Sequence, residues 1–256
     1  MTLCVACQFK LTPGEDDDAA IRVEVQRYDR LEARYLTTAD YSALMQMNTD
    51  YPMETKTLIE KMLKLGDVRD MNISNRFLMF YQDSTLQMVV SDAEAKYAKM
   101  DDINDELTRA FEKLSEWIPN IKVPTFYSQI GAFDQSIVVG DNTVGISLDK
   151  YMGEDYPIYK RYYSKQQVRS MKRSYIVPDC ICFYLLSMYQ LEDFDERPQI
   201  EKDLHIGKIM WVTNQVLGRN AFTMTYVAPI ERYMKVHKNV TVKQLLEAEN
   251  YPDFKK

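Results

Sequence analysis

Acidic side chains in and after a tyrosine-rich stretch are the residues of this sequence that could do acid–base chemistry. The stretch LDKYMGEDYPIY spans residues 148–159, and Asp179 follows. Paired carboxylates can act as general acid and general base when their surroundings separate their pKa values. No histidine, glycine-rich phosphate loop or G-x-S-x-G motif stands beside them, and Asp179 also fits a capping charge at a helix N-terminus. The candidate surface or loop site comprises Asp149, Tyr151, Glu154, Asp155, Tyr156, Tyr159 and Asp179.

The apolar segment that Pro178 opens would suit the metal-binding helix of a zinc peptidase, but it lacks the ligands. Such a helix needs two histidines four residues apart. The sequence has His205 and His237, both downstream of the segment and far from each other. We therefore expect no metal site and no other cofactor.

Two close pairs of cysteines raise the possibility of thiol chemistry. Cys180 and Cys182 are two positions apart, so on a helix their side chains point about 200° apart and cannot bridge each other. We expect buried free thiols rather than a Cys–His nucleophile, because no local signature supports the latter. Cys4 and Cys7 match C-x-x-C but lack the preceding strand of a redox motif and further metal ligands nearby.

The residues around Cys7 are similar to the end of a bacterial lipobox, an apolar run that closes with a small residue and the modified cysteine. Val5 and Ala6 fit this pattern, whereas Cys4 stands where leucine is usual. The residues before Cys7 are too few for a signal peptide. We expect a true start further upstream, lipid attachment at Cys7, and a signal end with a flexible tether over residues 1–20. The alternative is an accidental match.

Composition restricts the partners. A formal net charge of −6 argues against nucleic-acid binding, since phosphate neutralisation needs a basic surface. The locally basic segment 160–173 is either a solvated face or a contact for an anionic partner or lipid headgroup. No stretch approaches the ~20 apolar residues of a membrane span, so we expect membrane attachment through the N-terminal lipid alone.

Hydrophobic periodicity predicts an α+β fold, predominantly helical, in a single globular domain over residues 21–256. The clearest helix is 102–118, whose apolar residues recur at helical spacing and which Pro119 ends. Alternation predicts a strand at 21–26, and another follows at 121–130. Gly140 and its neighbours predict an antiparallel hairpin within 134–149, packed on a buried central helix at 178–189. Further helices are expected at about 39–48, 53–66, 75–82, 86–99, 199–216, 226–236 and 241–248.

Six segments, in order along the chain, resemble the gliding-motility lipoproteins of the GldB type from Bacteroidetes. They are VEVQRYD (23–29), LSEWIPN (114–120), GISLDKYMGEDYPIY (145–159), YIVPD (175–179), HIGKIMW (205–211) and ERYMKVHKNVTVKQLLE (231–247). The LDKYMGEDYPIY block is the most specific of them. The intervening segment 212–229 is shorter than in such proteins.

The resemblance implies a lipoprotein anchored to the outer membrane and facing the periplasm, with protein partners in the cell envelope. In gliding species it implies a link to motility and its associated secretion machinery. Such a protein would be a non-catalytic interaction scaffold, and we expect no enzyme activity. Two alternatives stay open: a hydrolase that uses the loop carboxylates on a degenerate zinc-peptidase-like scaffold, and a peptide- or glycan-binding lipoprotein. The latter would use a surface of Tyr151, Tyr156, Tyr159, Tyr162 and Tyr163.

Overall fold

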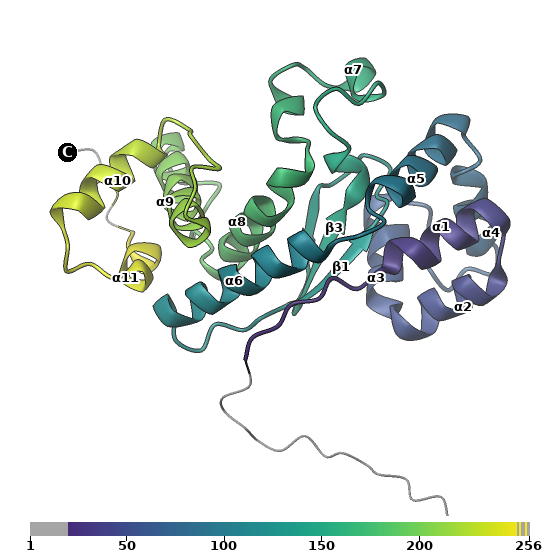
Figure 1. Cartoon of the computed structure of the whole chain (residues 1–256), viewed down its shortest axis with the longest axis horizontal. Helices are drawn as coiled ribbons and strands as arrows, with labels where there is room; N and C mark the ends of the chain where they lie inside the picture. Colours follow the sequence, from purple (N-terminus) through teal and green to yellow (C-terminus); the bar gives the residue numbers. More distant parts are fainter. Residues whose placement is uncertain (1–19, 250, 252–253, 255–256) are drawn as a thin grey trace, which may run out of the picture.

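The structure is a computed structural model that describes residues 20–249, 251 and 254. Helices dominate, and a small three-stranded sheet lies at the centre of the molecule (Figure 1). The predicted α+β class is confirmed. One group of helices lies at the right of Figure 1, a second at the left, and α6 and α8 run between them.

The N-terminal helices pack beside one edge of the sheet. They are α1 (Tyr28–Thr38), α2 (Tyr41–Asp50), α3 (Pro52–Lys56), its π-helical continuation η1 (Thr57–Met62), α4 (Ile73–Phe80) and α5 (Ser84–Lys96). Four of the predicted helices correspond to α2, α3–η1, α4 and α5, with shifted ends. Helix α1 was not predicted, yet it contacts α2, α5 and β1 and is the link between these helices and the sheet.

Helix α6 (Asp101–Trp117) has the predicted amphipathic character. Its buried residues follow helical spacing and face the core: Ile103, Leu107, Ala110, Phe111 and Leu114. Phe111 meets the ring of Phe126 edge-on, with 5.6 Å between ring centroids. Burial of such a stripe supplies several kcal/mol at ~25 cal/mol per Å² of apolar surface.

The sheet consists of β1 (Thr125–Gln129), β2 (Ile137–Val139) and β3 (Thr143–Ser147) in the order β1-β3-β2. Strands β2 and β3 form the predicted antiparallel hairpin. The prediction of an antiparallel sheet is nevertheless wrong for β1, which pairs parallel to β3 with Phe126 opposite Val144. The chain leaves β1 and first forms β2 at the far edge of the sheet. It then returns as β3, which lies between β1 and β2, so the sheet is mixed.

The predicted strand at 21–26 is an extended segment rather than a strand. Val23 and Val25 are buried and their neighbours exposed, as the alternation indicated. Their amides, however, donate to the side chains of Thr108 (3.0 Å) and Asn104 (3.1 Å) on α6. A single bridge joins Gln26 to β1. Side-chain acceptors on α6 thus replace a second strand.

The C-terminal half begins after β3 with short turns. These are η2 (Leu148–Tyr151), α7 (Tyr159–Tyr162), η3 (Gln167–Ser170) and η4 (Arg173–Tyr175), followed by α8 (Ile176–Met188), α9 (Gln199–Leu217), α10 (Val227–Val236) and α11 (Val242–Glu247). Helix α8 corresponds to the central helix predicted at 178–189, with both ends shifted toward the N-terminus, and contacts β2, β3, α6 and α9. It is not buried on every side, because Phe183 and Met188 are each 42% exposed.

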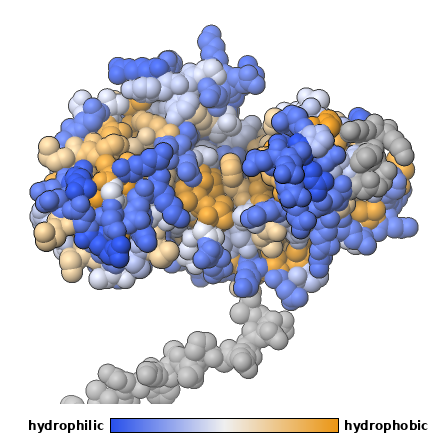
Figure 2. Space-filling model, turned by 180° about the vertical axis from the view of Figure 1, so that it is seen from behind, coloured by the Kyte–Doolittle hydropathy of each residue, from blue (hydrophilic) through white to orange (hydrophobic). Residues whose placement is uncertain are grey.

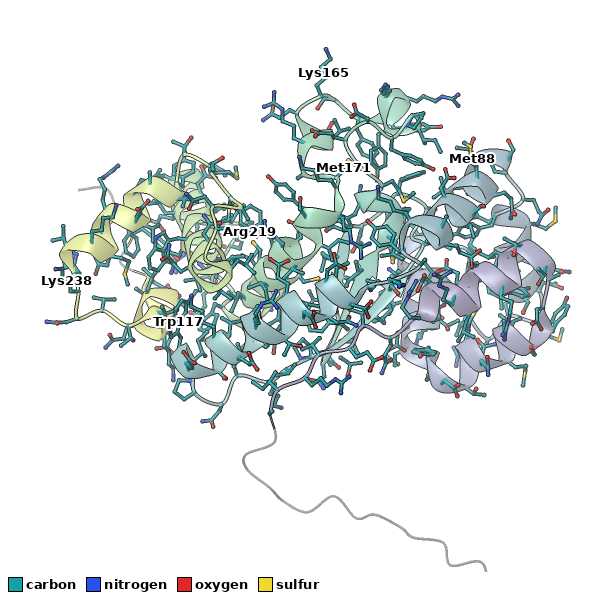
Figure 3. All side chains as sticks on the ribbon, viewed as in Figure 1. Met88, Trp117, Lys165, Met171, Arg219 and Lys238 are labelled. Carbon is teal, nitrogen blue, oxygen red and sulfur yellow. The ribbon has the colours of Figure 1, made fainter. Side chains whose placement is uncertain are left out.

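The protruding part of the molecule carries α7 and the basic segment 160–173. Lys165 lies at its tip, above Met171, in Figure 3. Lys172 and Arg173 of this segment form ion pairs with Glu154 (3.3 Å) and Asp102 (2.6 Å). Among the described residues, no helix combines the length and apolar character that crossing a membrane requires.

Candidate functional site

Asp149 lies in the core at the start of η2, not on a surface loop. Its side chain is fully buried. Oδ1 accepts a hydrogen bond from the Gly131 N–H (2.8 Å) and Oδ2 one from the Phe133 N–H (2.5 Å). Burial raises the pKa of Asp149, and the two backbone donors act against that rise. The carboxylate therefore holds the turn that follows β1.

That turn needs an external support because of its backbone conformation. Ala132 (φ 49°) and Phe133 (φ 65°) both lie in the left-handed region, which non-glycine residues rarely adopt. Successive N–H groups in such a turn converge on one side and bind an anion well. Here the anion is a side chain of the protein itself.

Glu32 holds the same turn from helix α1. Its Oε2 accepts from the Ile130 N–H (2.8 Å), while Oε1 is buried without a hydrogen-bond partner in the described structure. The Tyr81 hydroxyl donates to the Ile130 carbonyl (2.6 Å). Burial raises the pKa of Glu32 well above its usual value, and the neighbouring Asp149 raises it further.

Asp29 ties the first turn of α1 to β1. The Ser128 hydroxyl donates to its Oδ1 (2.5 Å), and Arg27 forms an ion pair with its Oδ2 (2.8 Å). Neither Asp29 nor Glu32 was predicted from the sequence. The available signal was the pattern of Tyr28, Tyr35 and Leu36 around Glu32, which places a carboxylate within an apolar helical stripe.

Asp179 and Tyr151 form a second, separate contact between η2 and α8. The Tyr151 hydroxyl donates to Asp179 Oδ2 (2.8 Å), and the Tyr97 hydroxyl donates to the Tyr151 carbonyl (2.6 Å). Burial raises the pKa of Asp179 to about 7, against the lowering effect of the Tyr151 hydrogen bond. Asp179 thus fixes η2 to α8 in addition to its position in the first turn of the helix.

The remaining acidic residues of the predicted site are exposed on the protein surface. Glu154 and Asp155 are exposed, and Glu154 pairs with Lys172 across the surface. The structure therefore distributes the four predicted carboxylates over three environments: the core, the start of α8 and the surface. It does not assemble them into one catalytic pair.

The predicted tyrosine surface is wrong for two of its five members. Tyr151 and Tyr159 are buried, because their hydroxyls reach polar groups inside the fold. The Tyr159 hydroxyl donates to the Asp149 carbonyl and accepts from the Met152 N–H (2.9 Å). Tyr156 donates to Asp92 (2.9 Å), and Tyr162 is 64% exposed. Tyr162 and Tyr163 line a shallow hollow of about 480 Å³ beside Phe133.

Of the four cysteines considered for thiol or metal chemistry, Cys180 and Cys182 are described by the structure, whereas Cys4 and Cys7 lie outside the described residues. Cys180 and Cys182 are buried free cysteines, as predicted. In the described part of the chain, no group of histidine, cysteine and carboxylate side chains could hold a metal ion. His205 lies beside the Tyr251 hydroxyl (3.2 Å), and His237 stacks on Tyr233. Cys7, the lipobox and the tether over residues 1–19 lie outside the described residues.

Comparison with models of known protein families shows which family the chain belongs to. A family model described as gliding motility protein GldB matches residues 12–226. The chain belongs to the GldB family. The matched region holds the β1–β2 turn with its two supporting carboxylates and ends just before α10, so α10 and α11 lie beyond the GldB match. Searches of curated proteins and of solved structures gave no match.

Proposed function

We propose that this GldB-family protein is a non-catalytic scaffold of the cell envelope that binds other proteins. The observation that carries the proposal is the use of Asp149. A catalytic carboxylate must reach a substrate, whereas both oxygens of this fully buried side chain accept backbone hydrogen bonds from Gly131 and Phe133. The most specific block of the GldB pattern thus supports the fold.

The surface of the N-terminal helices supports a protein-binding role. Several methionines are exposed there, and flexible, polarisable methionine side chains suit contact with varied protein partners. They are Met45 (62% exposed), Met53 (65%), Met71 (98%), Met79 (67%) and Met88 (49%). Figure 2 shows apolar patches interrupted by hydrophilic atoms over these helices, at the left of the view, and Figure 3 labels Met88 at their upper edge.

A binding experiment tests the scaffold role directly. Met71→Lys with Met79→Lys places two charges on the methionine-bearing surface, and Met224→Lys (57% exposed) is the matched control on the other side of the fold. Chemical cross-linking in native envelope fractions should give the same cross-linked species for the wild type and the control, and lose species in the double variant. Identical species in all three would contradict binding through this surface.

We also propose that lipid attachment at Cys7 anchors the protein to the outer membrane, facing the periplasm. The GldB family membership and the lipobox-like residues before Cys7 support this placement. The test is the mass and N-terminus of the mature chain from the native membrane fraction. A triacylated Cys7 as first residue is the expected result. An unmodified chain that starts at Met1 in the soluble fraction would remove the anchor.

A further inference from the structure

The outer edge of β2 is open for pairing with another strand. Hydrogen bonds from the Ser147 N–H to the Ser136 carbonyl and from the Gly140 N–H to the Thr143 carbonyl fix which residues of the hairpin face β3. In an antiparallel ladder, inward and outward residues alternate. The N–H and C=O groups of Ile137 and Val139 therefore point away from β3, and no described residue pairs with them. Ile137 is only 5% exposed, so the edge is accessible at Val139.

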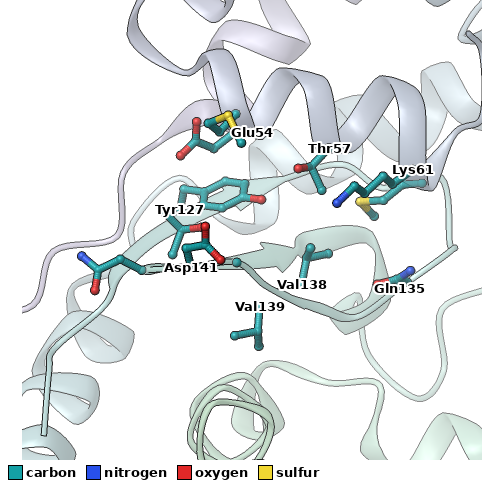
Figure 4. Close-up of a pocket in the computed structure, with 13 residues that line it drawn as sticks. Glu54, Thr57, Lys61, Tyr127, Gln135, Val138, Val139 and Asp141 are labelled. Carbon is teal, nitrogen blue, oxygen red and sulfur yellow. The ribbon is translucent and has the colours of Figure 1, made fainter. Parts of the chain in front are cut away.

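A cavity of about 550 Å³ lies beside this edge, between the sheet and the helix formed by α3 and η1. Val138 and Val139 line it from β2, and Thr57 and Lys61 line it from the helix (Figure 4). The helix changes here from α- to π-helical hydrogen bonding at Thr57. Single π-helical turns of this kind occur frequently at functional sites.

Tyr127 forms part of the cavity wall, and one glycine makes room for it. The Tyr127 ring lies over Gly145 on the neighbouring strand, where a Cβ atom would be 2.5 Å from both Cζ and the hydroxyl oxygen. The hydroxyl has no hydrogen-bond partner among the described residues and is oriented along the cavity in Figure 4. The wall thus combines an apolar ring with a free polar group, as ligand sites commonly do.

The charges along the cavity are arranged by sign. Glu54 and Asp141 lie toward one end in Figure 4, and Lys61 lies toward the other. None of these three forms an ion pair within the described part of the chain. A strand laid along β2 would meet acidic groups at one end and a basic group at the other.

We propose that β2 is the docking edge for an extended peptide segment of a partner protein. The segment adds to the sheet next to β2, pairs with the outward groups of Val139, and places a side chain in the cavity beside Val138. Its complementary charges are a basic residue near Glu54 and Asp141 and an acidic residue near Lys61. Backbone pairing supplies affinity and the cavity supplies selectivity in such edge-strand recognition. This inference rests on the proposed scaffold role and specifies the class of partner.

A displayed library of short random peptides, selected on the intact protein, tests the inference. Val139→Pro removes an outward N–H, and Val138→Trp fills the cavity. Val139→Thr keeps the N–H and a β-branched side chain and serves as the matched control. Selected peptides should bind the control like the wild type and bind each of the other two variants about tenfold more weakly or worse.

Amide hydrogen exchange gives a second readout that does not depend on a variant. In the free protein, the Val138 amide should be protected by its ladder bond, while that of the partly exposed Val139 exchanges quickly. Saturation with a selected peptide should slow the exchange of the Val139 amide. The Val138 amide also reports whether each variant keeps the fold.

Three outcomes would overturn the inference: no selected binder, binders unaffected by both Val139→Pro and Val138→Trp, or unchanged exchange at Val139 on saturation. These outcomes are distinguishable from failure of the scaffold role. That role is measured by the cross-linked species lost in the Met71→Lys and Met79→Lys double variant, and neither of these methionines lines the cavity.

Discussion

The Gly131 N–H donates a hydrogen bond of 2.8 Å to the Asp149 carboxylate, and this contact closes the left-handed turn after β1 against the start of η2. A second bond from the Phe133 N–H to the same carboxylate makes the turn and the side chain a single unit. Because Asp149 is buried, water could not replace its carboxylate, and removal of this acceptor would leave the two backbone N–H groups without a hydrogen-bond partner.

Asp149→Asn should therefore destabilise the fold without changing any chemistry. Asparagine has one acceptor oxygen, so one of the two backbone donors would lose its partner and face an amide group. We expect the free energy of unfolding to fall by about 1–3 kcal/mol. Urea denaturation at neutral pH measures it. The exposed Asp155→Asn is the control, and an equal loss in both variants would refute the supporting role.

The contact between Tyr151 and Asp179 predicts a pH dependence of stability. The pKa of Asp179 is about 7 in the fold and near its usual 3.8 in the unfolded chain. Over this interval the folded state binds more protons than the unfolded state, so this residue's contribution makes stability fall as pH rises from about 4 to about 7.

Asp179→Asn should remove that part of the pH dependence, because asparagine resembles the protonated acid. We expect the variant to be more stable than the wild type at pH 8, by about 1–2 kcal/mol given the partial exposure of the residue, and the difference to narrow toward pH 4. Thermal denaturation of both proteins at matched pH values measures the difference. A variant less stable than the wild type at pH 8 would show that the charged form is favoured.

Gly145 is required by the Tyr127 ring rather than by its backbone conformation. In Gly145→Ala, the added methyl group would overlap Tyr127, and we expect a loss of about 1–3 kcal/mol from overpacking. The same substitution in a Tyr127→Ala background should cost much less, since the ring is gone. A double-mutant cycle by urea denaturation measures the coupling. Equal costs in both backgrounds would contradict the contact.

Cys180 and Cys182 should not react in the folded protein. Burial raises the pKa of the Cys182 thiol to about 12 and that of Cys180 well above its usual value, so neither forms the reactive thiolate. Iodoacetamide should leave both unmodified in native protein and alkylate them in urea. Peptide mass spectrometry reads each cysteine separately. Rapid alkylation of either under native conditions would place it at an accessible site.

Elements whose signals lie within one short segment could be predicted from the sequence. The apolar stripe of α6, the turn residues of the β2–β3 hairpin and the continuous apolar run of α8 each lie within one short segment, and all three elements formed where expected. The sequence also selected Asp149 and Asp179 as unusual carboxylates. The capping interpretation already gave Asp179 a structural role, but the sequence revealed neither its contact with Tyr151 nor the supporting role of Asp149, because the partners lie elsewhere in the chain.

Contacts between groups far apart in the sequence depend on the packing of the whole fold. Glu32 supports Ile130 across a sequence separation of 98 residues, and no periodicity encodes such a contact. The parallel pairing of β1 with β3 likewise depends on where the intervening chain packs, and it leaves β2 at the sheet edge. Local patterns fix the conformation of a segment, whereas burial of its polar groups is settled only when remote segments supply the matching donors and acceptors.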